Sequence, residues 1–423
     1  MDSEQRIVLA HLSDLHLGYR SGRRVNSHGV NWREQDGYVA FKRVVDEILA
    51  DKTIDFVLIA GDVFHTPTPS VRTVYVAQKQ IRRLADAGLP VYILTGNHDV
   101  SDVRAEMAAT ALLNDPEHGV CAHWEPYAVH EAAPGVKLHL ISHHLYQEQA
   151  STWEQIKPDP NCVNILSTHG SVIDPLTKLA LHTEASPREV IIPDEIAGNP
   201  DWSYKLLGHI HERGFVGSKN GKTDTAGLKT YYNGSLLRRG FSDAATPLGR
   251  GWTKWTINPD GTMTPEFHLV PQRPQVDYPI IDASGMSAAD LTTAIVDELD
   301  DTLKDVPEGK WNVSPILRQK IMNMTPDKRR ALDQAAIYKA SGKALQWTMS
   351  VTSAEEEEDE AKQEKIGQTT GSVTEQFNGW LKDSKDYQAI HEGIREKVAE
   401  ETRRFIKQGQ DAVLDSDGED GKE

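Results

Sequence analysis

The chain has 423 residues, of which 38% are hydrophobic and 26% charged, and its formal net charge is −17. This length predicts a large core domain with one or two smaller units, and the composition is that of a globular protein. No apolar run approaches the roughly 20 residues of a membrane span, and the acidic start lacks the basic region of a secretory signal. We therefore expect a cytoplasmic protein with no membrane partner, in which Cys121 and Cys162 stay reduced rather than form a bridge.

Strand and helix patterns alternate along the first part of the chain. Apolar runs rich in β-forming residues occur at 7–12, 56–60 and 91–94, and helical patterns follow them at 38–49, 71–84 and 105–113. This βαβαβα order predicts neighbouring parallel strands. Later apolar runs predict a second sheet packed on the first, at 136–141, 163–166, 204–207 and 230–232. The expected fold class is thus α/β, a sandwich of two sheets.

A hairpin at 252–257 and 263–270 closes this first domain, and Pro271, Pro274 and Pro279 mark a boundary after it. A small α/β unit follows, with strands predicted at 278–281, 316–322 and 345–351 and helices at 287–303 and 326–338. Charged amphipathic helices are predicted within 373–407. The expected domains are 1–271, 272–353, an acidic linker at 354–370, a helical segment at 371–408 and an acidic tail at 409–423. Because much of the acid is segregated in the linker and tail, the net charge does not exclude a nucleic-acid partner.

Metal-binding residue types stand where five predicted strands end. They are Asp14 and His16, Asp62, Asn97 beside His98, His169, and the pair His209 and His211. Because the carboxyl ends of such strands share one edge of the fold, these side chains should meet there. The two i, i+2 pairs would project from one face of an extended backbone. Each fragment alone is a common accident, but the ordered set predicts a metal site, and its mixed carboxylate, imidazole and amide ligands suit manganese, iron or zinc.

The ordered signature Asp-x-His, Gly-Asp, Gly-Asn-His-Asp, a lone His and Gly-His-x-His resembles that of the calcineurin-like metallophosphoesterases over about the first 270 residues. Within that superfamily the chain is similar to the SbcD-type nucleases of double-strand-break repair, on the strength of Gly61-Asp62-Val63-Phe64-His65 with Pro69-Ser70, and of Tyr232-Asn233-Gly234-Ser235 with Phe241. The resemblance implies one metal held by Asp14, His16, Asp62 and His211 and a second held by Asp62, Asn97, His169 and His209. Asp62 would bridge the two ions.

The resemblance also implies an activity and partners. The expected activity is phosphodiester hydrolysis by a manganese-dependent DNA exo- and endonuclease, with iron, zinc or magnesium as alternative metals. His98 would orient the phosphate or protonate the leaving oxygen, and His65 would support it, although a structural role for His65 is nearly as good an interpretation. The small unit would help to seat DNA, the helical segment would bind an SbcC-type coiled-coil ATPase, and the protein would form a homodimer in a repair and recombination complex.

Two basic loops are the candidate phosphate contacts. Arg20, Arg23 and Arg24 follow the first metal motif, and Arg238 and Arg239 follow Gly234-Ser235. His143 and His144 end a predicted strand on the same edge and either approach substrate or have a structural role.

Two alternative functions stay open at this point. The chain could be a calcineurin-like phosphoesterase acting on a phosphoprotein or small nucleotide, since the metal signature fixes the reaction class better than the substrate. It could also be a non-catalytic scaffold that recruits an ATPase, although scaffolds of that kind lose ligands and none is missing here.

Overall fold

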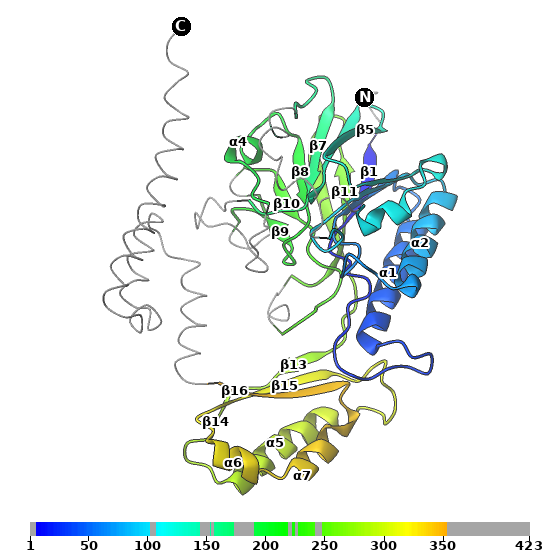
Figure 1. The fold of residues 1–423 in the computed structure, drawn as a ribbon. Helices are drawn as coiled ribbons and strands as arrows, with labels where there is room; N and C mark the ends of the chain where they lie inside the picture. Colours follow the sequence, from blue (N-terminus) through cyan, green and yellow to red (C-terminus); the bar gives the residue numbers. More distant parts are fainter. Residues whose placement is uncertain are drawn as a thin grey trace, which may run out of the picture. The chain divides into compact units, whose positions relative to one another are not determined.

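The computed structural model describes residues 6–101, 107–143, 153, 156–172, 190–218, 222–224, 227–241 and 248–352. Two six-stranded sheets and a separate four-stranded sheet organise these residues (Figure 1). The two larger sheets share one apolar core, which confirms the predicted α/β sandwich. None of the described helices is long and apolar enough to cross a membrane. The predicted linker, helical segment and tail, and His144, lie outside the described residues.

The first sheet has the strand order β12-β11-β1-β2-β3-β4. Its strands are β1 (Ile7–Leu12), β2 (Phe56–Ala60), β3 (Val91–Leu94), β4 (Val120–His123), β11 (Gly251–Ile257) and β12 (Met263–Leu269). β1 to β4 are parallel, which confirms the predicted parallel pairing of β1, β2 and β3. The hairpin formed by β11 and β12 joins this sheet, with β11 antiparallel to β1. The last strands of the sandwich in the sequence therefore lie beside its first strand.

The second sheet has the order β5-β6-β7-β8-β10-β9. Its strands are β5 (Tyr127–Ala133), β6 (Val136–Ile141), β7 (Val163–Thr168), β8 (Tyr204–Leu207), β9 (Gly214–Phe215) and β10 (Thr230–Tyr232). The four inner strands are parallel, and β5 and β9 pair antiparallel at the edges. The sequence analysis missed β4, β5 and β9, because short or half-exposed edge strands lack the buried apolar run on which the prediction depends.

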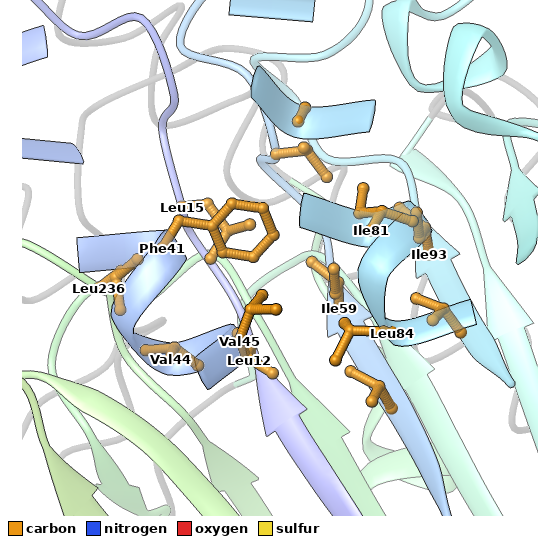
Figure 2. Close-up of a cluster of buried hydrophobic side chains, with 14 of the residues drawn as sticks. Leu12, Leu15, Phe41, Val44, Val45, Ile59, Ile81, Leu84, Ile93 and Leu236 are labelled. Atoms are coloured by element: carbon orange, nitrogen blue, oxygen red, sulfur yellow. The ribbon is translucent and has the colours of Figure 1, made fainter. Parts of the chain in front are cut away.

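Two helices cover the outer face of the first sheet (Figure 1). They are α1 (Trp32–Ala50) and α2 (Val71–Asp86), and each begins at a polar cap: Asn31 accepts from the Arg33 amide and Ser70 from the Thr73 amide. Figure 2 shows Phe41 and Val45 of α1 and Ile81 and Leu84 of α2 against strand residues of this sheet. Each such side chain contributes about 1.5–3 kcal/mol when fully buried, so this packing fixes the strands whose ends carry the site.

A second apolar layer lies between the sheets. Leu9, Phe56 and Trp255 of the first sheet pack with Leu138 and Ile165 of the second, and all five are fully buried. Because this layer locks the two sheets face to face, the strand ends of both can contribute to one site.

The small module, residues 275–352, belongs with the sandwich to one compact unit, Met1–Asp359. Its strands are β13 (Gln275–Asp277), β14 (Ile281–Asp282), β15 (Ile316–Met322) and β16 (Gln346–Thr352), and its helices are α5 (Ala288–Leu303), α6 (Pro326–Ala331), α7 (Gln334–Ala340) and η5 (Ser341–Lys343). The other three strands all pair in parallel with β15. Leu291, Ile295 and Leu299 of α5 pack against Leu317 and Ile321 of β15 to form its core.

The helix expected at 38–49 begins six residues earlier, at Trp32, and three further predicted elements differ from those observed. The strand expected at 278–281 is split into β13 and β14, because Pro279 has no amide hydrogen to continue the ladder. The helix expected at 326–338 is broken at Leu332, whose backbone is extended, and Asp333 caps a new helix by accepting from the Ala336 amide. Of the helix expected at 105–113, the described part is a single 3-10 segment, η1 (Ala109–Leu113). Two further short elements are η2 (Pro116–His118) and α4 (Asp194–Ala197).

Candidate metal centre

The structure brings all seven predicted ligand residues to one edge of the sandwich. Asp14 and His16 follow β1, Asp62 follows β2, Asn97 follows β3, His169 follows β7, and His209 and His211 follow β8. Neighbouring backbones hold these loops together. The Asp14 amide donates to the Gly61 carbonyl at 3.1 Å, and both Asp14 carboxylate oxygens lie 3.2 Å from the His209 amide.

One group of donor atoms surrounds His16. The Nε2 atoms of His16 and His211 face each other at 3.1 Å. Asp14 Oδ1 lies 4.0 Å from His16 Nε2 and 3.8 Å from His211 Nε2. Ligand atoms of these three residues all fall within 4.8 Å of one another, which is a spacing that a single metal ion can bridge.

A second group surrounds Asn97. Its Oδ1 lies 3.1 Å from His169 Nε2 and 3.2 Å from His209 Nδ1. Asp62 stands between the two groups, since its Oδ2 is 3.5 Å from His16 Nε2 and 3.3 Å from His169 Nε2. This is the position that a bridging carboxylate would occupy.

The backbone at these ligands is strained. Six residues other than glycine have positive φ in the described part of the chain, and four of them are Asp14, His16, Asp62 and His209, with φ of 51°, 43°, 51° and 95°. The prediction that the i, i+2 pairs lie on extended backbone was therefore wrong, because tight left-handed turns aim these side chains. Each such residue costs on the order of 1–3 kcal/mol, and strain of this kind clusters at functional sites.

Glycines beside the ligands allow a close approach that no other residue could make. A Cβ on Gly96 would stand 2.2 Å from Asp62 Oδ1, and one on Gly208 would stand 1.9 Å from the Ala60 carbonyl oxygen. Glycine is therefore required in the Gly-Asn-His-Asp and Gly-His-x-His motifs because no space remains for a Cβ, and not because a particular turn favours it.

The electrostatics of the centre fit added positive charge. Burial, and then the nearby Arg239, lower the pKa of His16 and His211 well below the ordinary value, so both imidazoles are neutral, as metal ligation requires. Burial opposes ionisation of Asp62, yet His169 holds the pKa of this carboxyl well below its usual range. Burial also opposes the charged form of His169, but the Asp62 carboxylate prevails and raises its pKa to about 9. Asp62 and His169 thus attract each other, at 3.3 Å, across the place that a cation could occupy.

The donor set and its surroundings fit a pair of divalent cations. His169 has its Nδ1 2.9 Å from the Ala60 carbonyl, an arrangement that leaves Nε2 as the ligand atom. Two carboxylates among the ligands would leave two such ions with a net positive charge, which suits a phosphate group.

His98 and His65 lie at the rim of the centre. The His98 amide donates to Asp62 Oδ1 at 2.9 Å, and its ring Nδ1 lies 3.0 Å from the His65 carbonyl oxygen. The two rings stack at 5.3 Å, and His65 Nδ1 is 3.5 Å from His16 Nδ1. Ligand atoms of His65, His98 and His16 also lie within 4.8 Å of one another, so both rings adjoin the first group, and their role toward a substrate stays a prediction.

Asp99 holds the turns rather than the substrate. Its carboxylate accepts from the amides of Gly96, Val63 and Phe64 at 2.9, 3.2 and 2.8 Å. Burial, and then Asp62, raise its pKa to about 7. It therefore ties the turn after β2 to the turn after β3.

The predicted arginines divide into two kinds. The Arg239 guanidinium lies 3.1 Å from the His211 ring nitrogens and so reaches the metal centre. Arg20 donates to Glu34 at 2.7 Å, and Arg24 stacks 3.9 Å from the ring centroid of Trp311 in the small module. Arg23 is exposed, and Arg238 is half-buried, with a carbonyl that accepts from Arg33 and Gln275. Phosphate contacts by Arg20, Arg23, Arg24, Arg238 and Arg239 all stay predictions.

Residues that no motif indicated also line the centre. A pocket beside Asp14 and His16 is bounded by Tyr19, Arg33 and Glu34. Glu34 is buried and accepts from the Tyr38 hydroxyl at 2.6 Å. His143, also buried, has its Nδ1 3.4 Å from the His169 carbonyl oxygen, which supports the structural interpretation of this residue. The only sequence signal for Tyr19 and Glu34 is their nearness to Asp14 and His16.

Comparison with known proteins shows one family match and partial relatives. The calcineurin-like phosphoesterase family model matches residues 7–230. The DNA double-strand break repair protein Mre11 of Sulfurisphaera tokodaii is 27% identical over 218 residues, covering 48% of this chain and 49% of that protein. Its counterpart in Aeropyrum pernix is 41% identical over 96 residues, covering 23% and 22%. The chain spans between about a fifth and a half of the length of the curated relatives it matches.

Among solved structures, a dimetal phosphatase from Danio rerio aligns with 60% of this chain and 93% of its own, at 9% identity and a TM-score of 0.36. A score this low supports no inference about substrate.

Proposed function

This chain belongs to the calcineurin-like phosphoesterase family, and from that premise we propose that it is a two-metal phosphodiesterase that cleaves DNA. The observation that carries the proposal is the position of Asp62 between two groups of donor atoms, each completed by histidines from separate strand ends. The relatives named as double-strand break repair proteins support DNA as the substrate.

The residues that would hold the metals are those that the structure gathers. Asp14, His16 and His211 would hold one ion, Asn97, His169 and His209 the other, and Asp62 both. Manganese is the metal we propose, because nitrogen-rich mixed ligation suits it better than magnesium or calcium. When bound, a pair of divalent cations supplies an activated water and neutralises charge on the phosphoryl oxygens.

The chain's own groups would bind the phosphate and transfer protons. Arg239 would bind a phosphate oxygen, which its 3.1 Å distance from His211 supports. With its Nδ1 held by the His65 carbonyl, His98 keeps Nε2 for the substrate, where it would protonate the leaving oxygen. His65 would keep the His98 ring in that orientation through its carbonyl and its stacked ring.

We also propose partners for the whole protein. Residues 371–408 would bind an SbcC-type coiled-coil ATPase, the small module would help to seat DNA, and two copies would pair as a homodimer. The charged amphipathic pattern of 373–407 supports a partner for that segment, and the relatives' name as double-strand break repair proteins supports DNA as what the module seats. Such a complex would work inside the cell on broken DNA ends.

An assay with three substrates tests the function. The Mn²⁺-loaded full chain is incubated with end-labelled single-stranded DNA, end-labelled duplex DNA and p-nitrophenyl phosphate, with and without a candidate ATPase. We expect DNA cleavage that EDTA abolishes. Hydrolysis of p-nitrophenyl phosphate with both DNAs intact would replace the nuclease by a phosphatase. A folded, metal-loaded sample that hydrolyses nothing would favour a scaffold.

A further inference from the structure

The backbone that carries Arg239 is held by side chains from several parts of the chain. The Tyr19 hydroxyl donates to the Arg239 carbonyl at 2.8 Å. The Arg238 amide donates to Gln272 Oε1 at 3.0 Å, and the Arg238 carbonyl accepts from the Arg33 guanidinium. Arg239 is thus presented to the metal centre by a backbone that Tyr19, Gln272 and Arg33 all bind through their side chains.

Arg33 is itself one end of a buried charge network. Its Nη1 donates to Asp36 Oδ2 at 2.7 Å. Arg273 grips the same carboxylate with two parallel bonds, from Nε at 2.7 Å and from Nη2 at 2.6 Å. The side chains of Arg33 and Arg273 are each 2% exposed and that of Asp36 is 18% exposed, so solvent can replace little of this network. Bidentate geometry of this kind fixes orientation as well as distance.

The network ends in the small module. Arg273 Nη1 donates to the carbonyls of Trp311 at 2.7 Å and Ser314 at 2.6 Å, both in the loop before β15. Gln275 of β13 adds a second connection, because its Nε2 donates to the Arg238 carbonyl at 3.3 Å. A displacement of this loop would therefore move the partners of Arg273 and, through Asp36 and Arg33, the carbonyl beside Arg239.

We propose that Arg33, Asp36 and Arg273 are positioning residues that couple the small module to Arg239. The module then acts on phosphate binding by setting the place of Arg239, in addition to any contact of its own with substrate. This inference rests on the proposed function for its effect on catalysis, but the mechanical coupling that it asserts does not depend on any substrate.

Hydrogen exchange of the full chain tests the coupling without metal or substrate. Asp36→Asn removes the charge that both arginines share, and we expect faster amide exchange in residues 234–241. Asp51→Asn is the matched control, since Asp51 pairs with Lys254 at 2.6 Å between α1 and β11, outside the network. It should leave that segment unchanged. Equal exchange in wild type and Asp36→Asn, or equal loosening in both variants, would overturn the proposal.

Kinetics on bis-p-nitrophenyl phosphate test the consequence. Displacing Arg239 should lower kcat/KM in Asp36→Asn by about 10- to 100-fold, the range expected when a group is misplaced by about 1 Å. In an Arg239→Ala background the same substitution should have no further effect, because the network acts through Arg239. Multiplying losses in the double variant would make the network merely structural and defeat the proposal.

The proposal can still be tested if the variant does not fold or if the wild type has no activity. If Asp36→Asn does not fold, Arg273→Lys removes the bidentate pairing with Asp36 while keeping the positive charge. The same exchange and kinetic results are expected from this variant. If the wild type hydrolyses no diester, the proposed function fails, whereas the exchange of residues 234–241 still decides whether the network positions Arg239.

Discussion

The metal-centre edge and the small module differ in how strongly their backbones restrict which residue can stand at each position. At the edge, Asp14, Asp62 and His209 adopt left-handed backbone, and Gly96 leaves no room for a side chain. In the small module only Asn323 has a positive φ among its described residues other than glycine, and asparagine tolerates that region. The edge therefore fixes the identity of single residues, whereas the module requires only that apolar positions and caps recur at the right spacing.

The largest effect should come from the carboxylate that both ligand groups share. Asp62→Asn removes the bridging charge, so we expect loss of both metals and of all hydrolysis. Metal content by mass spectrometry and bis-p-nitrophenyl phosphate turnover measure this. Asp282→Asn, at an exposed carboxylate of the small module, is the control and should change neither. Full metal content in Asp62→Asn would show that Asp62 does not bridge.

The second effect separates chemistry from metal binding at the same edge. His98→Ala should keep both metals and the fold, because His98 is not one of the seven proposed ligands and its ring only packs edge-on against His16. Hydrolysis should fall by about 10²- to 10⁴-fold, the usual contribution of a general acid. Turnover equal to that of wild type, in a sample with full metal content, would remove His98 from the mechanism.

The same contrast explains what the sequence could predict about the site. The seven ligand residues and the rim histidines occur in short motifs at strand ends, so local sequence was enough to predict that they lie at one edge of the fold. The partners of Arg33 were not predictable in this way, since Asp36 meets Arg273 across 237 positions of the chain. Arg24 shows the same limit, because its stacking on Trp311 depends on where the small module packs.

A third test compares glycines in the two regions. Gly96→Ala would force a Cβ to within 2.2 Å of Asp62, whereas Gly285 in the small module has nothing within 4 Å of an added Cβ. We expect the first to lower the free energy of unfolding by about 1–3 kcal/mol and to reduce metal affinity. The second should be neutral or stabilising by up to about 1 kcal/mol. Chemical denaturation of both variants decides between these outcomes.

The fold was predicted best where burial is two-sided. β1, β2, β3, β6, β8 and β10 have the predicted bounds because each is a short apolar run with clear ends, and β15 has them although its burial alternates. The errors fall where one backbone group overrides a pattern. Apolar spacing continues through Pro279 and Leu332. The missing amide hydrogen of Pro279 ends the ladder, and Asp333, directly after Leu332, caps a new helix. The edge strands were missed because half-exposed residues carry little periodic signal.

The smallest effect should come from a cap in the small module. Ser287 accepts from the Asp290 amide while Asp290 accepts from the Ser287 amide, so the two form a capping box at the start of α5. Ser287→Ala should therefore lower the free energy of unfolding by about 1 kcal/mol. Asp290→Ala in the same chain should add less than its separate effect, since each substitution already breaks the box. Thermal unfolding of the single and double variants measures both quantities. Hydrolysis should stay at the wild-type rate in each, because the box lies outside the Arg33, Asp36 and Arg273 network. A loss of activity that follows the loss of this cap would mean that the whole module, and not only the loop beside Arg273, sets the geometry of the edge.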